Sequence, residues 1–124
     1  MQNGKLLFEK LEAWKQARQV THSIYTLFRI PELHRDFGLS NQMQRAAVSV
    51  MSNLAEGYER LHPNEKLQFY NVARASNAEI RSLLYVIEDN FPETAQQSIQ
   101  LRAQVNSVGR LISGLINSTR SRTH

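Results

Sequence analysis

An amide and a carboxylate stand between two arginines in the stretch 38–60, a combination that occurs both in active sites and in buried polar networks. Read as a helix at about 100° per residue, this stretch places Arg45, Asn53, Glu56 and Arg60 on one side. A buried carboxylate needs hydrogen-bond donors or must take up a proton, and the stretch 65–89 offers matching partners. We therefore favour a structural polar network over an active site. The expected members of the network are Ser49, Asn53, Glu56, Ser76 and Glu79.

The sequence lacks the residues that metal binding or nucleophilic catalysis would need. Cysteine is absent, and the four histidines, at positions 22, 34, 62 and 124, include no pair at the i, i+4 spacing of helical metal ligands. No glycine-rich phosphate loop and no nucleophile elbow is present. The sequence therefore predicts a protein that is not an enzyme and that carries neither a metal nor a cofactor.

One enzymatic alternative stays open. Arg29 and His34 form an Arg-x4-His pattern that some ribonucleases built as four-helix bundles share. Pro31 lies between them and would take His34 off the helix that carries Arg29. Because acid–base catalysis depends on the mutual geometry of its groups, we place this hypothesis behind the non-catalytic ones.

Rows of basic side chains run along three of the expected helices, away from the apolar stripes. The row on the third helix includes Asn77 and is flanked by Tyr70 and Tyr85. Such rows suit contacts to phosphate and sugar, and interleaved aromatic rings can stack on bases. The alternative is that they are solvated outer faces, which any soluble helix needs. Their shared richness in arginine, with few acidic residues interleaved, points instead to nucleic acid, and the net charge of +4 and the pI near 9.8 agree with this. The expected contact residues are Lys15, Arg18, His22, Arg29, Arg74, Arg81, Arg102, Arg110, Arg120 and Arg122.

Apolar residues recur at spacings of three and four along the chain, and no stretch alternates as a strand would. The pattern predicts helices over about 7–30, 40–61, 64–89 and 94–118, with Ser40 as the N-cap of the second helix. Pro31, Pro63 and Pro92 separate them. Residues 117–124 are expected to fray as a polar basic tail. The predicted fold is a single all-α domain over 1–124, an up-down-up-down four-helix bundle.

The second helix has a broader apolar arc than one packing partner needs. The apolar stripe is widened by Val48, Met51 and Ala55. We therefore expect this helix to be buried on two sides, with the additional apolar side chains facing another subunit. No run approaches the roughly 18 apolar residues of a membrane span, and no secretion signal opens the chain. We therefore expect a cytoplasmic protein that makes no membrane contact.

Several motifs resemble those of bacterial four-helix-bundle proteins encoded in intervening sequences of 23S ribosomal RNA genes. The first helix shows Leu-Glu-Ala-Trp-Lys-Gln-Ala at 11–17, and the second shows Arg-Ala-Ala-Val-Ser-Val at 45–50 followed by Asn-Leu-Ala-Glu-Gly at 53–57. Phe-Gly-Leu at 37–39 precedes the second helix, and Ala-Ser-Asn-Ala-Glu-Ile at 75–80 lies in the third. The chain departs from the family pattern at Ala75 and Asn77, which affects local packing.

The resemblance implies a four-helix bundle that assembles as a ring-like homopentamer and has no established enzymatic activity. Relatives include the accessory variability determinant of diversity-generating retroelements, a basic pentamer that binds a reverse transcriptase and nucleic acid. The resemblance thus implies three partners: further copies of the chain, RNA or DNA, and a reverse transcriptase.

Together these observations predict a non-enzymatic, oligomeric nucleic-acid-binding accessory protein. The alternative is a structural scaffold of the intervening-sequence family that binds other proteins and has no nucleic-acid role. A helical ribonuclease that uses Arg29 and His34 is the third hypothesis.

Overall fold

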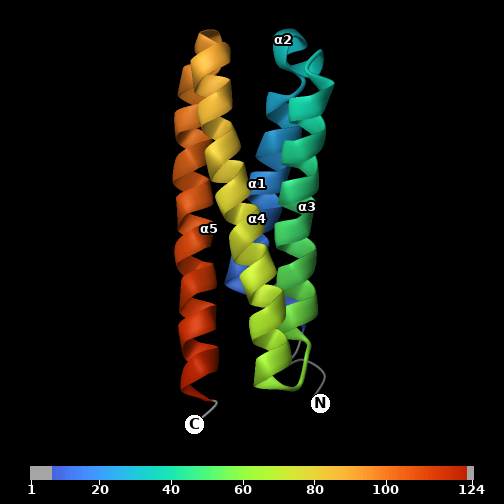
Figure 1. The fold of residues 1–124 in the computed structure, drawn as a ribbon, viewed down its shortest axis with the longest axis vertical. Coiled ribbons are helices and arrows are strands. Elements are labelled where there is room, and N and C mark those ends of the chain that lie inside the picture. The colour runs from blue at the N-terminus through green and yellow to red at the C-terminus, as the bar shows by residue number, and fades with distance from the viewer. Residues whose placement is uncertain (1–6, 123–124) are drawn as a thin grey trace.

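The computed structural model describes residues 7–122, and this part of the chain is helical without any strand (Figure 1). The all-α prediction is confirmed. The long helices are α1 (Glu12–Leu27), α3 (Phe37–Tyr58), α4 (Pro63–Asn90) and α5 (Ala95–Ser121). Three short elements join or precede them: η2 (Phe8–Lys10), α2 (Pro31–His34) and η3 (Pro92–Thr94).

The four long helices form an elongated antiparallel bundle, with the short connections at its two ends (Figure 1). Helix α3 packs against α4 and α1, and α5 packs against α4 and α1. Helices α1 and α4 therefore lie at opposite corners, and α1 runs behind α4 in Figure 1. No helix within residues 7–122 combines the length and the apolar composition that crossing a bilayer requires.

The first connection differs from the prediction. Pro31 does more than end the first helix, because it opens α2 at the first helical position, where its missing N–H is no loss. The predicted N-cap, Ser40, is wrong: α3 begins at Phe37, and the Asp36 carboxylate accepts a hydrogen bond from the Leu39 N–H at 3.1 Å. A carboxylate at this position also interacts favourably with the helix dipole.

The last helix is longer than expected. Residues 117–121, predicted to fray, continue α5 because Thr119 is buried and its hydroxyl donates to the Leu115 carbonyl at 2.7 Å. The remainder of the predicted tail, 123–124, lies outside the described residues.

Helix α4 buries a face that includes part of the basic row predicted on this helix. Its buried positions are spaced by three and four residues, as in a coiled-coil seam: Tyr70, Ala73, Asn77, Ile80, Leu84 and Ile87. Asn77 and Tyr70, which we expected on a basic outer row, are thus core residues and cannot contact nucleic acid. The Asn77 side-chain amide donates to the Val105 carbonyl of α5 at 3.1 Å, which satisfies a buried polar group and fixes the α4/α5 register.

Helices α3 and α4 pack tightly against each other at Gly57. A Cβ placed there would lie 2.8 Å from Tyr70 Cε1 and 2.9 Å from Phe69 Cβ. Since the Phe69 Cβ moves only with the α4 backbone, no side-chain rotation relieves this clash. The absent side chain therefore sets the distance between the two helices at this crossing.

Gly57→Ala should destabilise the protein by about 1–3 kcal/mol, because α4 must shift to make room for the methyl group. Gly114→Ala is the matched control: a Cβ at Gly114 of α5 meets nothing within 4 Å. This change should stabilise by about 0.5–1 kcal/mol through helix propensity. Urea unfolding of the two variants checks both signs, and an unchanged or raised stability of Gly57→Ala would contradict the close approach.

Tyr70 should make the fold sensitive to alkaline pH. Burial, with a smaller effect of Tyr58, raises the pKa of Tyr70 to about 12, and Arg122 partly offsets this rise. An unfolded chain loses this proton near pH 10, whereas the folded chain keeps it. Between pH 10 and 12 the stability should therefore fall, by at most about 1 kcal/mol per pH unit from this group.

The matching variant is Tyr70→Phe, which should flatten the pH dependence of unfolding between pH 10 and 12. Identical slopes for the parent protein and Tyr70→Phe would show that burial of this phenol is not coupled to its titration.

Candidate nucleic-acid interface

The α4/α5 face carries exposed arginines from both helices. The Asn77–Val105 hydrogen bond sets the antiparallel register, so helical spacing places Arg74 and Arg81 of α4 on the flank that adjoins α5. Arg110 of α5 faces outward, on the half of the helix that is nearer to α4 than to α1. All three side chains are exposed. Helix α5 contains no aspartate or glutamate at all, so acidic residues do not break up its positive charge.

Arg102 differs from the other predicted contact residues on this face. Its guanidinium forms an ion pair with Glu88 and lies 4.1 Å from the ring centroid of Tyr85, in cation–π geometry. The Arg102 side chain is largely buried, at 19% exposure. Arg102 therefore joins α4 to α5, and its charge is compensated inside the protein. The Tyr85 ring remains half exposed.

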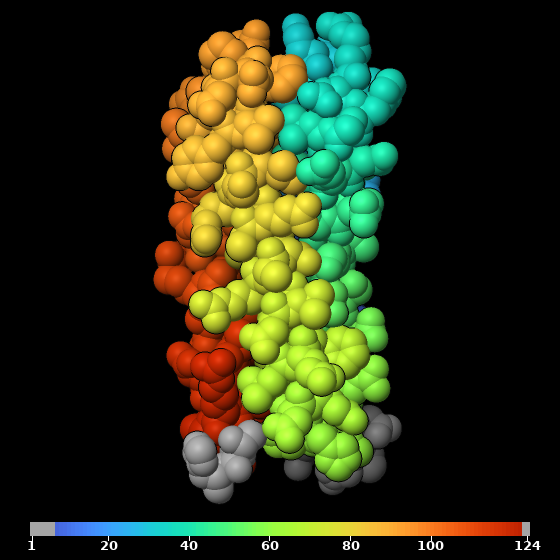
Figure 2. Space-filling model, viewed as in Figure 1, coloured from blue at the N-terminus to red at the C-terminus, as the bar shows by residue number. Residues whose placement is uncertain are grey.

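The α1 row lies on another side of the bundle. Lys15, Arg18, His22 and Arg29 are all exposed, but α1 packs on α3 and α5 and lies diagonally opposite α4. The Arg18 guanidinium lies 5.8 Å from the ring centroid of Trp14. The predicted basic rows thus form two separate surfaces, one along α1 and one over α4 and α5. Figure 2 shows the second surface, with α4 in front and α5 beside it.

A third basic group gathers near the turn between α3 and α4. The Lys66 ammonium donates to the Tyr58 carbonyl at 2.7 Å and to the Gly57 carbonyl at 3.4 Å, at the negative end of the α3 dipole. Partial burial, and then the nearby Arg122, lower the pKa of Lys66. Arg122 itself contacts the Ser118 hydroxyl at 3.5 Å, and Arg120, two residues earlier, is exposed.

The predicted polar network is present in part. The hydroxyls of Ser49 and Ser76 lie 2.8 Å apart, and the Asn53 amide donates to the Ser49 carbonyl and hydroxyl at 2.8 and 3.1 Å. These three residues join α3 to α4 at half-buried positions.

The two predicted carboxylates lie outside this network. Since α3 and α4 are antiparallel with Ser49 opposite Ser76, Glu56 and Glu79 lie on opposite sides of that contact, about 15 Å apart along the axis at 1.5 Å per residue. Both side chains are exposed, so the expected buried carboxylates are wrong. Glu56 pairs with Arg60 at 3.6 Å in solvent.

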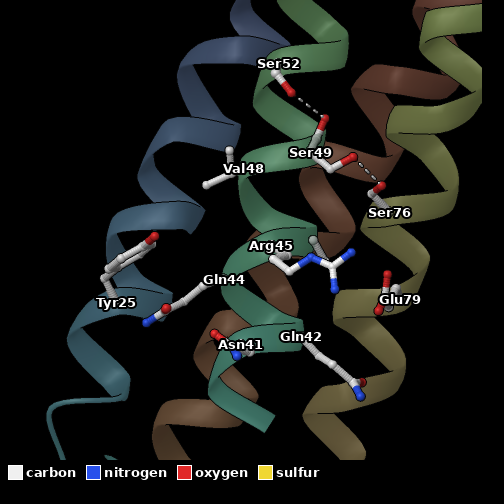
Figure 3. Close-up of a pocket in the computed structure, with 11 residues that line it drawn as sticks. Tyr25, Asn41, Gln42, Gln44, Arg45, Val48, Ser49, Ser52, Ser76 and Glu79 are labelled. Atoms are coloured by element: carbon white, nitrogen blue, oxygen red, sulfur yellow. Dashed lines mark hydrogen bonds between the residues drawn. The ribbon is translucent and has the colours of Figure 1, made fainter. Parts of the chain in front are cut away.

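A polar groove of about 570 Å³ lies over α3, between α1 and α4. In Figure 3 the Arg45 side chain points from α3 toward Glu79 of α4, while Val48 and Tyr25 line the opposite edge. Val48 is 47% exposed and Tyr25 is 43% exposed, so part of the wide apolar arc of α3 is uncovered in the single chain.

The ribonuclease hypothesis depends on two residues that occupy different elements. Arg29 follows the end of α1, and His34 closes α2, where its ring packs edge-on against Phe37 at 6.2 Å between centroids. Within residues 7–122 no group of three or more His, Asp or Glu side chains is arranged to hold a metal ion.

The sequence matches the model of the family described as 23S rRNA-intervening sequence protein over residues 9–114. The chain belongs to this family. The match covers α1, α3, α4 and most of α5, so the family resemblance extends through the whole bundle. A comparison with curated proteins finds no match.

In this family member the sequence reasoning missed a row of amides. Gln97, Gln100 and Gln104 are exposed on the side of α5 that adjoins α1. Their spacing of three and four residues is a signal that the sequence already contains. It was passed over because uncharged glutamines on an outer helix face are ordinary solvent-facing residues.

Proposed function

We propose that this protein is a non-catalytic, oligomeric nucleic-acid-binding protein. The observation that carries the proposal is the α4/α5 face, where Arg74, Arg81 and Arg110 are exposed and α5 contributes no carboxylate. Exposed arginines on one face suit a string of phosphates, whose neutralisation releases counterions and drives binding. The half-exposed Tyr85 ring on the same face can stack on an unpaired base.

Self-association is the second part of the proposal. Val48 and Tyr25 leave an apolar strip open beside the groove over α3, and covering it with a further copy would remove that surface from water. The family resemblance suggests a ring of five copies. At a net charge of +4 each, such a ring would carry about +20 and bind phosphate polymers with a steep salt dependence.

The family resemblance also names a protein partner for this proposal. A relationship to the accessory variability determinant implies that a reverse transcriptase binds the oligomer, which then holds the nucleic acid beside that enzyme. A scaffold without a nucleic-acid role is the competing function, and the uncovered strip at Tyr25 and Val48 is the observation that favours it.

Replacing Arg74, Arg81 and Arg110 with Gln should weaken binding to structured RNA by at least about tenfold near 50 mM salt. Each lost phosphate contact should also reduce the slope of log K against log salt by roughly 0.7–0.9. A titration at about 50 and 200 mM salt measures both quantities.

The matched control for this triple variant replaces Lys10, Arg35 and Arg45, three exposed cations on other parts of the surface, with Gln. It changes the net charge equally and should retain most of the affinity. Equal losses in the two triple variants would rule out the α4/α5 face as the interface. No binding by the parent protein at low salt would end the nucleic-acid proposal and leave the scaffold.

Light scattering tests the assembly. The parent protein should have a mass several times that of the 14.3 kDa chain, and Val48→Glu should lower it by placing a charge in the apolar strip. Ile99→Glu, on α5 at the corner opposite α3, should leave the mass unchanged although Ile99 is also exposed. A parent protein of 14.3 kDa in solution would refute the oligomer.

A further inference from the structure

From the groove between α1 and α5 we infer a binding site for a single strand of nucleic acid with unpaired bases. This inference rests on the proposed function and adds to it, since it assigns a second surface and a class of ligand. The α4/α5 face offers charge for a phosphate backbone, whereas the α1/α5 groove offers charge and base-pairing groups together.

The groove is continuous along two helices. Two hollows of about 710 and 480 Å³ meet at His22, Ser23 and Gln104, which line both of them. The first reaches Trp14 and the second reaches Leu27, a separation of about 20 Å along α1 at 1.5 Å per residue. This length suits several nucleotides of an extended strand.

The two walls carry different chemistry. The α1 wall presents the cations Lys15 and Arg18 and the imidazole of His22, which suit phosphates. The α5 wall presents the amides Gln97, Gln100 and Gln104. Among the described residues that line the groove, Glu9 at one end is the one carboxylate. The charge therefore favours an anionic ligand in the part of the groove that Lys15 and Arg18 line.

The three amides make no hydrogen bond within the described part of the chain, so their donors and acceptors are open to a ligand. Gln16, a fourth amide from α1, is used internally: it donates to Glu12 and accepts from Ser107. An amide that offers a donor and an acceptor side by side matches the edge of a base. The cations and the amides lie in successive halves of the groove, which meet at His22 and Gln104, so one half offers contacts for phosphates and the next offers pairing groups for bases.

The amides favour a single strand over a duplex. Bases in a duplex have their pairing edges occupied, whereas unpaired bases can turn toward the amides. A protein helix is a poorer occupant, because the groove has an apolar floor only at Leu27, Ile30 and Leu101.

Trp14 makes binding observable. It is the only tryptophan in the sequence, and it is half-buried at the end of the groove, edge-on to Phe8 with ring centroids 4.9 Å apart. A strand that enters the groove displaces or contacts the Arg18 guanidinium beside this ring. Binding of a single strand should therefore quench or shift tryptophan fluorescence.

The experiment titrates the full chain with a 20-nucleotide RNA of mixed sequence that cannot pair with itself, and with the duplex of that RNA and its complement. The groove variant replaces Gln100 and Gln104 with Ala, which leaves the net charge unchanged. The control replaces Gln42 and Gln68, two exposed amides outside the groove, with Ala. Circular dichroism melting verifies that both variants fold.

The groove variant should bind the single strand at least about fivefold more weakly than the parent, with the same salt slope, because hydrogen bonds and no charges are lost. Its affinity for the duplex should not change, and the control should match the parent. The fluorescence of Trp14 should respond to the single strand and not to the duplex.

Other outcomes separate the inference from the proposed function. If the parent binds RNA but the groove variant binds the single strand equally well, the groove inference fails and the α4/α5 interface stands. Equal losses in the groove variant and the control also overturn the inference. If the parent binds neither RNA at low salt, the proposed function fails first and the groove inference fails with it.

Discussion

The close approach of α3 and α4 at Gly57 is the constraint on which the rest of the structure depends. With no Cβ at this position, Tyr70 and Phe69 pack directly against the α3 backbone. The contact fixes the antiparallel register, which then brings Ser49 beside Ser76, about 12 Å along α3 from Gly57. On the other flank of α4, the hydrogen bond from the Asn77 amide to the Val105 carbonyl fixes the position of α5 along α4. Both faces that we assign to nucleic acid depend on where α5 lies.

The fold could be predicted from the sequence because periodicity and prolines carry most of the information. Apolar spacing located the four long helices, and Pro63 marked the start of α4 correctly to within one residue. The misses were local. Asp36 replaced Ser40 as the cap because α3 begins at Phe37, earlier than predicted, and the Asp36 carboxylate accepts a hydrogen bond from the Leu39 N–H. Thr119 extended α5 because its hydroxyl bonded within its own helix and its side chain was buried.

The candidate site was less predictable, since a helical wheel gives angles and not the register between helices. Asn77 is of a residue type that usually lies at the surface, yet it is one of the buried positions of α4 that recur at spacings of three and four residues. Arg102 is of a residue type that often binds phosphate, yet its guanidinium pairs with Glu88 and lies over the ring of Tyr85, both from the neighbouring helix. Glu56 and Glu79 match in type but are separated along the axis by antiparallel packing. Each of these outcomes depends on a neighbouring helix, so the residue pattern of a single helix could not reveal it.

The central claim is that nucleic acid contacts the outer surfaces of α4 and α5 and the groove between α5 and α1. Ultraviolet crosslinking of the protein to single-stranded RNA, with the modified peptides identified by mass spectrometry, maps the contact most directly. The account predicts crosslinked peptides from α4 and α5 that include Tyr85 and Arg110, and from α1 around Trp14. Crosslinks confined to α3, or no crosslinks at low salt, would contradict it.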